Sequence, residues 1–303
     1  MLVLGCGGFL GAPVAARLGE LPGVQVLRGA RSGGGGRAAG PRPDLVADLA
    51  DVQVDFLAVQ LTALRPDVVV NCAGLTSGSA SRLCAVNAQG AAALGEAMAL
   101  AVPSARLVHL GSAAEYGPGE PGTSLGESAP ARPAGLYGAA KLAGTLAVAA
   151  ARLDAVVLRV FNPVGAGAPV SGLPGRLAAA LRAAPRDGTV RTGDLGAYRD
   201  FVDVTDVAEA VALAATAPGR LPPVLNVGSG RATEVRDLVH ELAAISGFTG
   251  RIEESGAGSE RSAATSWVRA DITLAGAALG WRPARTLRDS LTDLWSARAG
   301  APA

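Results

Sequence analysis

Short apolar runs alternate with longer segments of helical periodicity through the first half of the chain. An apolar run at residues 2–4 opens the sequence, and further runs predict strands at 24–27, 46, 67–71, 107–111 and 155–161. Helical patterns lie between them, at residues 12–18, 53–64, 81–100 and 136–153. Because these strands are apolar throughout rather than alternating, they are typical of a parallel sheet buried on both faces. The pattern predicts an α/β fold.

The regular alternation of strand and helix patterns ends after residue 161. A loop rich in Gly and Pro at 165–174 precedes helical patterns at 176–184 and 203–217 and a strand at 224–227. Three further helical patterns, at 235–246, 272–279 and 287–298, are expected to lie outside the sheet. A chain of 303 residues is long enough for one large α/β unit with a smaller appended region.

Composition excludes several classes of function. A formal net charge of +1 and an aromatic content of 4% argue against a nucleic-acid partner. The three cysteines form no CxxC pair and only two histidines are present, so no metal site is predicted and the thiols are expected to be reduced. The apolar stretch at 142–160 is interrupted by Arg152 and Asp154, so no membrane span is expected and the chain is predicted to be cytoplasmic.

A glycine-rich turn follows the first apolar run. Gly5, Gly8 and Gly11 form a GxxGxxG pattern between a predicted strand and a predicted helix. Glycine lets the backbone turn sharply and approach a pyrophosphate, whose charge is stabilised at a helix N-terminus. The pattern predicts a dinucleotide-binding turn.

Three polar residues form the candidate catalytic set. Tyr137 and Lys141 are four residues apart in an Ala-rich helical pattern, which places them on one helix face. A nearby ammonium lowers the pKa of a phenol, so such a pair can exchange a proton with a sugar or alcohol oxygen. Ser112 follows an apolar strand, at the end where parallel α/β sheets bind ligands.

In order along the chain, these motifs resemble those of the extended short-chain dehydrogenase/reductases, which include nucleotide-sugar epimerases, dehydratases and reductases. The resemblance covers nearly the whole chain. It rests on the glycine-rich turn, Ser112, Tyr137, Lys141 and the segments at 48–49, 71–74, 86–87, 159–165, 199–204, 226–230 and 279–283.

The resemblance implies a Rossmann-type doubly wound parallel sheet with a smaller C-terminal substrate-binding region. Residues 1–165 would form the NAD(P)-binding core, with 200–230 returning to it, and 166–199 with 231–303 would bind substrate. Tyr137 would be the general acid/base, Lys141 would lower its pKa and bind ribose, and Ser112 would bond to the reacting oxygen. The other residues implied at the cofactor are Gly5, Gly8, Phe9, Leu10, Gly11, Arg31, Ser32, Asp48, Leu49, Cys72, Ala73, Gly74, Asn87, Phe161 and Val164. Those implied at the substrate, besides Ser112, are Thr76, Asn162, Leu173, Arg199 and Arg261.

The chain departs from the family pattern at two places. NAD-preferring members carry an acid where the second strand ends, whereas this chain has Gly29-Ala30-Arg31-Ser32. Arg31 could pair with a 2′-phosphate, so NADP(H) is favoured and NAD(H) stays open. The 4,6-dehydratases carry an Asp-Glu pair just after the position of Ser112, but this chain has Ala113-Ala114, which disfavours dehydration. Glu115 lies one place further on and is expected to point elsewhere.

The preferred interpretation is an NADP(H)-dependent ketoreductase acting on a nucleotide-linked 4-keto-deoxysugar. A nucleotide-sugar C4-epimerase would use the same residues, and a ketoreductase for a non-sugar natural-product ketone also stays open, because a fold does not fix its substrate. A non-catalytic NAD(P)-sensing protein is the alternative from another class, although such a protein needs no catalytic set. Related enzymes pair the helices at 81–100 and 136–153 across a two-fold axis, which predicts a homodimer.

Overall fold

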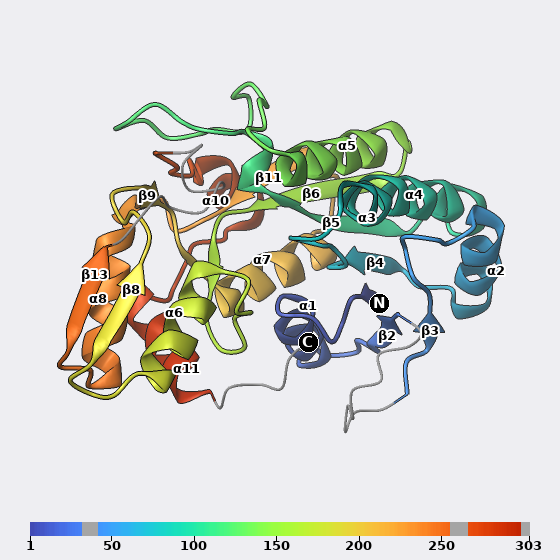
Figure 1. Cartoon of the computed structure of the whole chain (residues 1–303). Coiled ribbons are helices and arrows are strands. Elements are labelled where there is room, and N and C mark those ends of the chain that lie inside the picture. Colours follow the sequence, from blue (N-terminus) through green and yellow to red (C-terminus); the bar gives the residue numbers. More distant parts are fainter. Residues whose placement is uncertain (32–41, 255–265, 298–303) are drawn as a thin grey trace.

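The computed structural model describes residues 1–31, 42–254 and 266–297, and within them a seven-stranded parallel sheet forms the centre (Figure 1). Its strands are β1 (Leu2–Leu4), β2 (Leu27–Ala30), β3 (Leu45–Val46), β4 (Val68–Asn71), β5 (Arg106–Ser112), β6 (Asp154–Val160) and β11 (Val224–Val227). Their order is β11-β6-β5-β4-β1-β2-β3. The order reverses between β1 and β4, and ligands bind outside the carboxyl ends of the strands at such a reversal. The predicted fold class is confirmed.

Helices cover both faces of the sheet. One face packs against α1 (Gly11–Gly19), α7 (Val204–Thr216) and α10 (Thr273–Leu279), and the other against α2 (Val54–Leu64), α4 (Gly90–Ala101) and α5 (Leu136–Ala150) (Figure 1). Val3 belongs to the first of these cores, whereas its neighbours Leu2 and Leu4 belong to the second. Successive strand residues therefore bury opposite faces, which explains the uninterrupted apolar runs.

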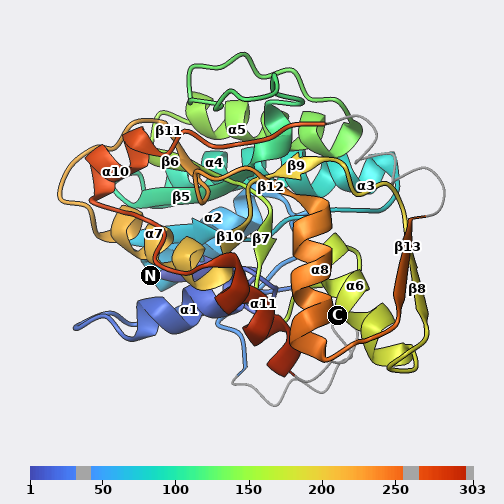
Figure 2. The same ribbon diagram turned by 90° about the vertical axis from the view of Figure 1, so that its left-hand side faces the viewer.

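A second lobe has its own hydrophobic core. Helices α6 (Leu173–Ala183), α8 (Val235–Ser246) and α11 (Leu287–Ser296) pack together beside β8 (Thr189–Thr192), which pairs with β13 (Arg251–Glu254) (Figure 2). Two short pairs complete the described strands: β7 (Pro163–Val164) with β10 (Val202–Asp203), and β9 (Tyr198–Arg199) with β12 (Thr233–Glu234). Over the described ranges, no helix combines the length and apolar character that a membrane crossing needs.

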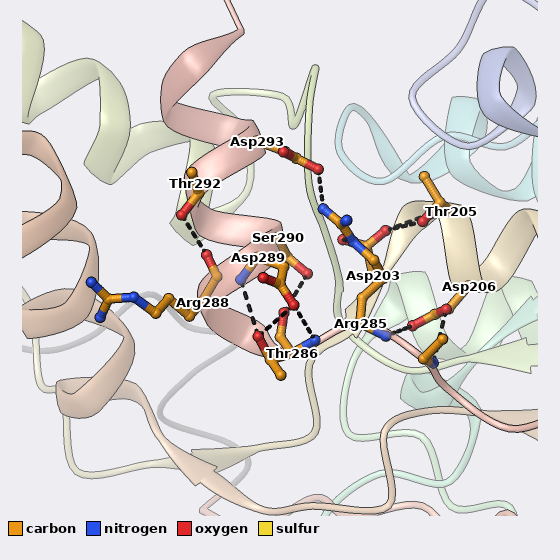
Figure 3. Close-up of polar contacts among 11 residues, drawn as sticks. Asp203, Thr205, Asp206, Arg285, Thr286, Arg288, Asp289, Ser290, Thr292 and Asp293 are labelled. Carbon is orange, nitrogen blue, oxygen red and sulfur yellow. Dashed lines mark hydrogen bonds and ion pairs between the residues drawn. The ribbon is translucent and has the colours of Figure 1, made fainter.

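The C-terminal segment is tied to the N-terminus of α7 by polar contacts (Figure 3). Asp206 accepts hydrogen bonds from the main-chain N–H groups of Ala284 and Arg285, at 3.1 and 3.0 Å. The Arg285 guanidinium pairs with Asp293 of α11 and lies 3.8 Å from Asp203, which caps α7. Trp281, 1% exposed, anchors the same segment in the main core. These contacts fix α11, and with it the second lobe, against the sheet.

The element boundaries differ from the prediction most clearly at the second strand. The chain turns at residues 21–24, and β2 begins only at Leu27, where it pairs with Leu2 of β1. The predicted helix at 81–100 is interrupted by a π-helical turn, η1 (Ala85–Gln89), between α3 (Ala80–Cys84) and α4. The helix predicted at 176–184 begins earlier, at Leu173, because Pro174 fits the first turn of a helix.

Candidate active site

The glycine-rich turn lies between β1 and α1, where side chains would collide with the backbone. A Cβ atom at Gly11 would lie 2.0 Å from the carbonyl oxygen of Gly5, and Gly5 itself has a φ of +72°. Gly8 is exposed and its N–H donates to the Gly5 carbonyl at 2.9 Å. Phe9 and Leu10 lead into α1, and the N-cap residue Leu10 makes no side-chain hydrogen bond to the first turn. This turn fits the pyrophosphate of a dinucleotide at a helix N-terminus.

The other predicted cofactor residues line the strand ends on both sides of this turn. Asp48 and Leu49 follow β3, and Cys72, Ala73 and Gly74 follow β4. Asn87, buried in η1, accepts a hydrogen bond from the Leu75 N–H at 3.0 Å and donates one to the Leu75 carbonyl at 2.8 Å. Asn87 therefore fixes the loop after β4, beside the glycine-rich turn.

Arg31 directly follows the last residue of β2 and is exposed. The Gly29 carbonyl accepts hydrogen bonds from the N–H groups of Gly5 and Cys6, at 3.0 and 3.3 Å, so this strand end lies against the glycine-rich turn. Ala30, at the position where the family resemblance predicts an acid in NAD-preferring members, ends the strand. Ser32 lies outside the described residues.

The three candidate catalytic residues come from two elements that meet at the carboxyl end of β5. Ser112 ends β5, half-buried, and its Oγ accepts a hydrogen bond from the Ala114 N–H at 3.2 Å. Tyr137 and Lys141 lie in the first two turns of α5. Between them, a Cβ atom at Gly138 would lie 2.2 Å from the Ala114 carbonyl oxygen. Glycine thus lets the start of α5 approach the turn after Ser112.

Lys141 is almost completely buried, with 4% of its surface exposed. Its Nζ donates a hydrogen bond to the Leu110 carbonyl oxygen of β5 at 2.5 Å. Burial lowers the pKa of Lys141 to about 8, against the opposing effects of Glu115 and Cys72. A buried ammonium near the start of α5 can bind ribose hydroxyls and stabilise a phenolate.

The predicted substrate residues come from several different elements. Asn162, after β6, donates a hydrogen bond to the Asp200 carbonyl at 2.9 Å, and Arg199 lies in β9 and donates to the Tyr198 carbonyl. Thr76 is exposed in the loop after β4, and Leu173 opens α6. Arg261 lies outside the described residues.

Phe161 and Val164, after β6, are both 0% exposed. Phe161 packs beside Tyr116, with ring centroids 6.2 Å apart. The Phe161 N–H donates to the Val227 carbonyl oxygen at 2.9 Å, and Val164 pairs with Asp203 of β10, so both residues hold the end of β6 in place.

The sequence interpretation missed a buried polar network behind Ser112. Glu115, in the 3-10 turn η2 (Ala113–Glu115), is 0% exposed and points into the protein, as expected for a residue that does not serve dehydration. Its carboxylate accepts hydrogen bonds from the Ser112 N–H, from Thr145 of α5 and from Arg159 of β6. The spacing of Ser112 and Glu115 is that of a capping box, a signal present in the sequence.

A second set of buried contacts holds the carboxyl ends of β6 and β11 in place. Asp200, 0% exposed, accepts hydrogen bonds from the N–H groups of Ser229, Gly230 and Ala270. Asn226 accepts a hydrogen bond from the Tyr116 hydroxyl at 2.8 Å. Within the described ranges, no three His, Cys, Asp or Glu side chains gather as a metal would need.

Comparison with known proteins identifies the family to which this chain belongs. The sequence profile of the NAD dependent epimerase/dehydratase family matches residues 1–228. The dTDP-6-deoxy-L-talose 4-dehydrogenase (NAD(P)(+)) of Kitasatospora kifunensis is 42% identical over 310 residues, covering 99% of this chain and 96% of that protein. The UDP-glucose 4-epimerase of Neisseria gonorrhoeae is 30% identical over 233 residues, covering 69% and 67%.

The fold is shared with solved structures as well. The UDP-glucose 4-epimerase of Thermus thermophilus, in complex with NAD, has a TM-score of 0.81 and 26% identity to this chain, with 96% of each chain covered. The chain therefore belongs to the NAD dependent epimerase/dehydratase family and is an NAD(P)-dependent enzyme of the extended short-chain dehydrogenase/reductase type.

Proposed function

We propose that this enzyme reduces a nucleotide-linked 4-keto-6-deoxysugar to the 4-hydroxy sugar, with NADPH as the hydride donor. The observation that carries the proposal is the meeting of Ser112 with the first turns of α5, which bear Tyr137 and Lys141. The relative from Kitasatospora kifunensis supports the sugar class, because its name describes oxidation at C4 of a dTDP-linked 6-deoxyhexose, the reverse of this reaction.

The glycine-rich turn fits the cofactor, since glycine permits its tight backbone packing and a main chain without side chains can approach a pyrophosphate. When bound, the reduced nicotinamide supplies the hydride that forms the new C–H bond at the carbonyl carbon. The carbonyl electron pair then moves to oxygen, and Tyr137 donates its phenolic proton to that oxygen. Because Ser112 Oγ accepts from the Ala114 N–H, its own hydrogen remains free to bond the same oxygen. Lys141 stabilises the phenolate left on Tyr137.

NADP(H) is the proposed cofactor because of the end of β2. Ala30 offers no carboxylate to a ribose 2′-hydroxyl, and Arg31 is exposed beside the glycine-rich turn. An arginine fork suits the geometry of a 2′-phosphate.

C4-epimerisation is the second candidate, favoured by the similarity to UDP-glucose 4-epimerases in sequence and in structure. An epimerase would use Tyr137 first as a base and then as an acid, and would regenerate its cofactor in each cycle. It therefore differs from a reductase in consuming no cofactor.

The test is NADPH consumption, followed by absorbance, against a panel of 4-keto sugar nucleotides that includes dTDP-linked 6-deoxyhexoses, with NMR of the product. We expect stoichiometric oxidation of NADPH and a new C4 hydroxyl. Interconversion of C4 epimers without net NADPH loss would support the epimerase instead. Reduction only of non-sugar ketones would contradict the sugar assignment, and binding of NADPH without any turnover would favour a sensor.

A further inference from the structure

Glu115 contacts each of the elements that carry the candidate catalytic residues. Its Oε1 accepts a hydrogen bond from the Ser112 N–H at 2.8 Å. Its Oε2 accepts one at 2.9 Å from Thr145, which lies one turn beyond Lys141 on α5, and one at 2.8 Å from Arg159 of β6. The loop after β5, α5 and β6 are thus joined through a single carboxylate.

Burying this carboxylate costs free energy, which argues that Glu115 has a role in function rather than in stability. Glu115 and Arg159 have side chains that are 0% and 6% exposed, and a buried ion pair is often no more stable than apolar residues of the same volume. Gly111 leaves room for it, since a Cβ atom there would lie 2.7 Å from Glu115 Oε1. Arg159 in turn stacks on Tyr116, 4.4 Å from the ring centroid.

We propose that Glu115 is a positioning residue, which holds Ser112 and α5 in register and places a negative charge against the helix one turn beyond Lys141. This inference rests on the proposed function for the roles of Ser112 and Tyr137. The effect of the Glu115 charge on Lys141 can be tested as long as the enzyme binds a nicotinamide cofactor.

The other groups near Lys141 cannot supply this charge. Burial raises the pKa of Cys72, after β4, to about 12, and burial together with Lys141 lowers the pKa of His109, on β5, so both are neutral near pH 8. Tyr137 lies one turn earlier on α5. Removing the negative charge of Glu115 should therefore lower the pKa of Lys141 further.

The test compares Glu115→Gln with Asp154→Asn. Arg106 and Asp154 form a bridge of the same type across β5 and β6, at the opposite end of both strands, where Arg106 Nε donates to Asp154 at 2.9 Å. Asp154 is more exposed than Glu115, at 30%, so its loss should cost less stability. NADPH affinity is measured by fluorescence as a function of pH, together with kcat, KM and Tm for each variant.

In Glu115→Gln, we expect the alkaline loss of NADPH affinity to move to lower pH and kcat to fall at least about tenfold, since a misplacement of ~1 Å can cost 10²-fold in rate. Asp154→Asn should lower Tm without either change. If Glu115→Gln does not fold, Thr145→Val removes only the bond from α5, and it should lower kcat severalfold, whereas Asp154→Asn should lower Tm alone.

A folded Glu115→Gln variant with the wild-type kcat and pH midpoint would overturn the inference, as would a wild-type kcat in Thr145→Val. If the wild-type enzyme binds NADPH but reduces no sugar nucleotide, the proposed function fails. The pH dependence of NADPH affinity then still tests the electrostatic role of Glu115.

Discussion

At the scale of single residues, the chemistry depends on the hydroxyl of Tyr137. If Tyr137 donates the proton to the developing alkoxide, Tyr137→Phe should lower kcat by at least about 10²-fold while leaving NADPH affinity nearly unchanged. Lys141→Met should weaken both, since the buried ammonium also binds ribose in the proposed site. Ser112→Ala should fall between these variants and wild type. Steady-state kinetics and fluorescence titration measure the two quantities. Near-normal turnover by Tyr137→Phe would mean that the proton comes from elsewhere.

Arg31 controls the choice of cofactor in our proposal. NADPH should bind more tightly than NADH, and Arg31→Ala should remove most of the difference by weakening NADPH binding alone. Arg28, within β2 and three residues away, provides a matched control, because its Ala variant removes the same charge from a neighbouring position. Equal affinities of the wild-type enzyme for the two cofactors, measured by titration, would disprove the assignment.

At the scale of helices and strands, the sequence was sufficient to predict those elements whose hydrophobic pattern lies within one continuous segment. The run Val68–Asn71 is buried at every position and forms a central strand, and α8 has the predicted bounds because its apolar face repeats at helical spacing. Tyr137 and Lys141 are four residues apart, so they share a face in any helix that contains both, and α5 is that helix.

Elements that depend on distant partners could not be predicted in this way. β2 begins at Leu27 because β1 sets its register, and nothing in residues 24–27 alone encodes that pairing. The short β8 and β13 strands pair with each other 62 residues apart, as at Thr189 and Arg251. The buried contacts of Glu115 likewise join three elements, so its capping-box spacing predicts the bond to Ser112 but not those to Thr145 and Arg159.

At the scale of the whole molecule, the winding of the sheet brings the site together. The order reverses between β1 and β4, which puts the glycine-rich turn and the loop after β4 side by side. The second lobe is held against the carboxyl end of the sheet by α11 and by the contacts of Asp206 and Arg285. The residues proposed at the cofactor therefore follow strands of the main sheet, whereas Arg199 and Leu173, proposed at the substrate, lie in β9 and α6.

The outer surface of α4 and α5 leads to a prediction about assembly. Leu146 in the middle of α5 is 62% exposed and Leu100 near the end of α4 is 69% exposed, on two Ala-rich helices that pack side by side (Figure 1). Exposed apolar side chains of this kind mark surfaces that associate, and two copies related by a two-fold axis would bury both helices at once.

We expect a homodimer in sedimentation velocity at micromolar concentration, and a monomer after Leu146→Arg. Val59→Arg, on the outer side of α2, places the same charge on a residue that is 66% exposed and should leave the dimer intact. A monomeric wild-type protein would show that this dimer does not form. A dimer that survives Leu146→Arg but not Val59→Arg would place the dimer contact elsewhere on the protein.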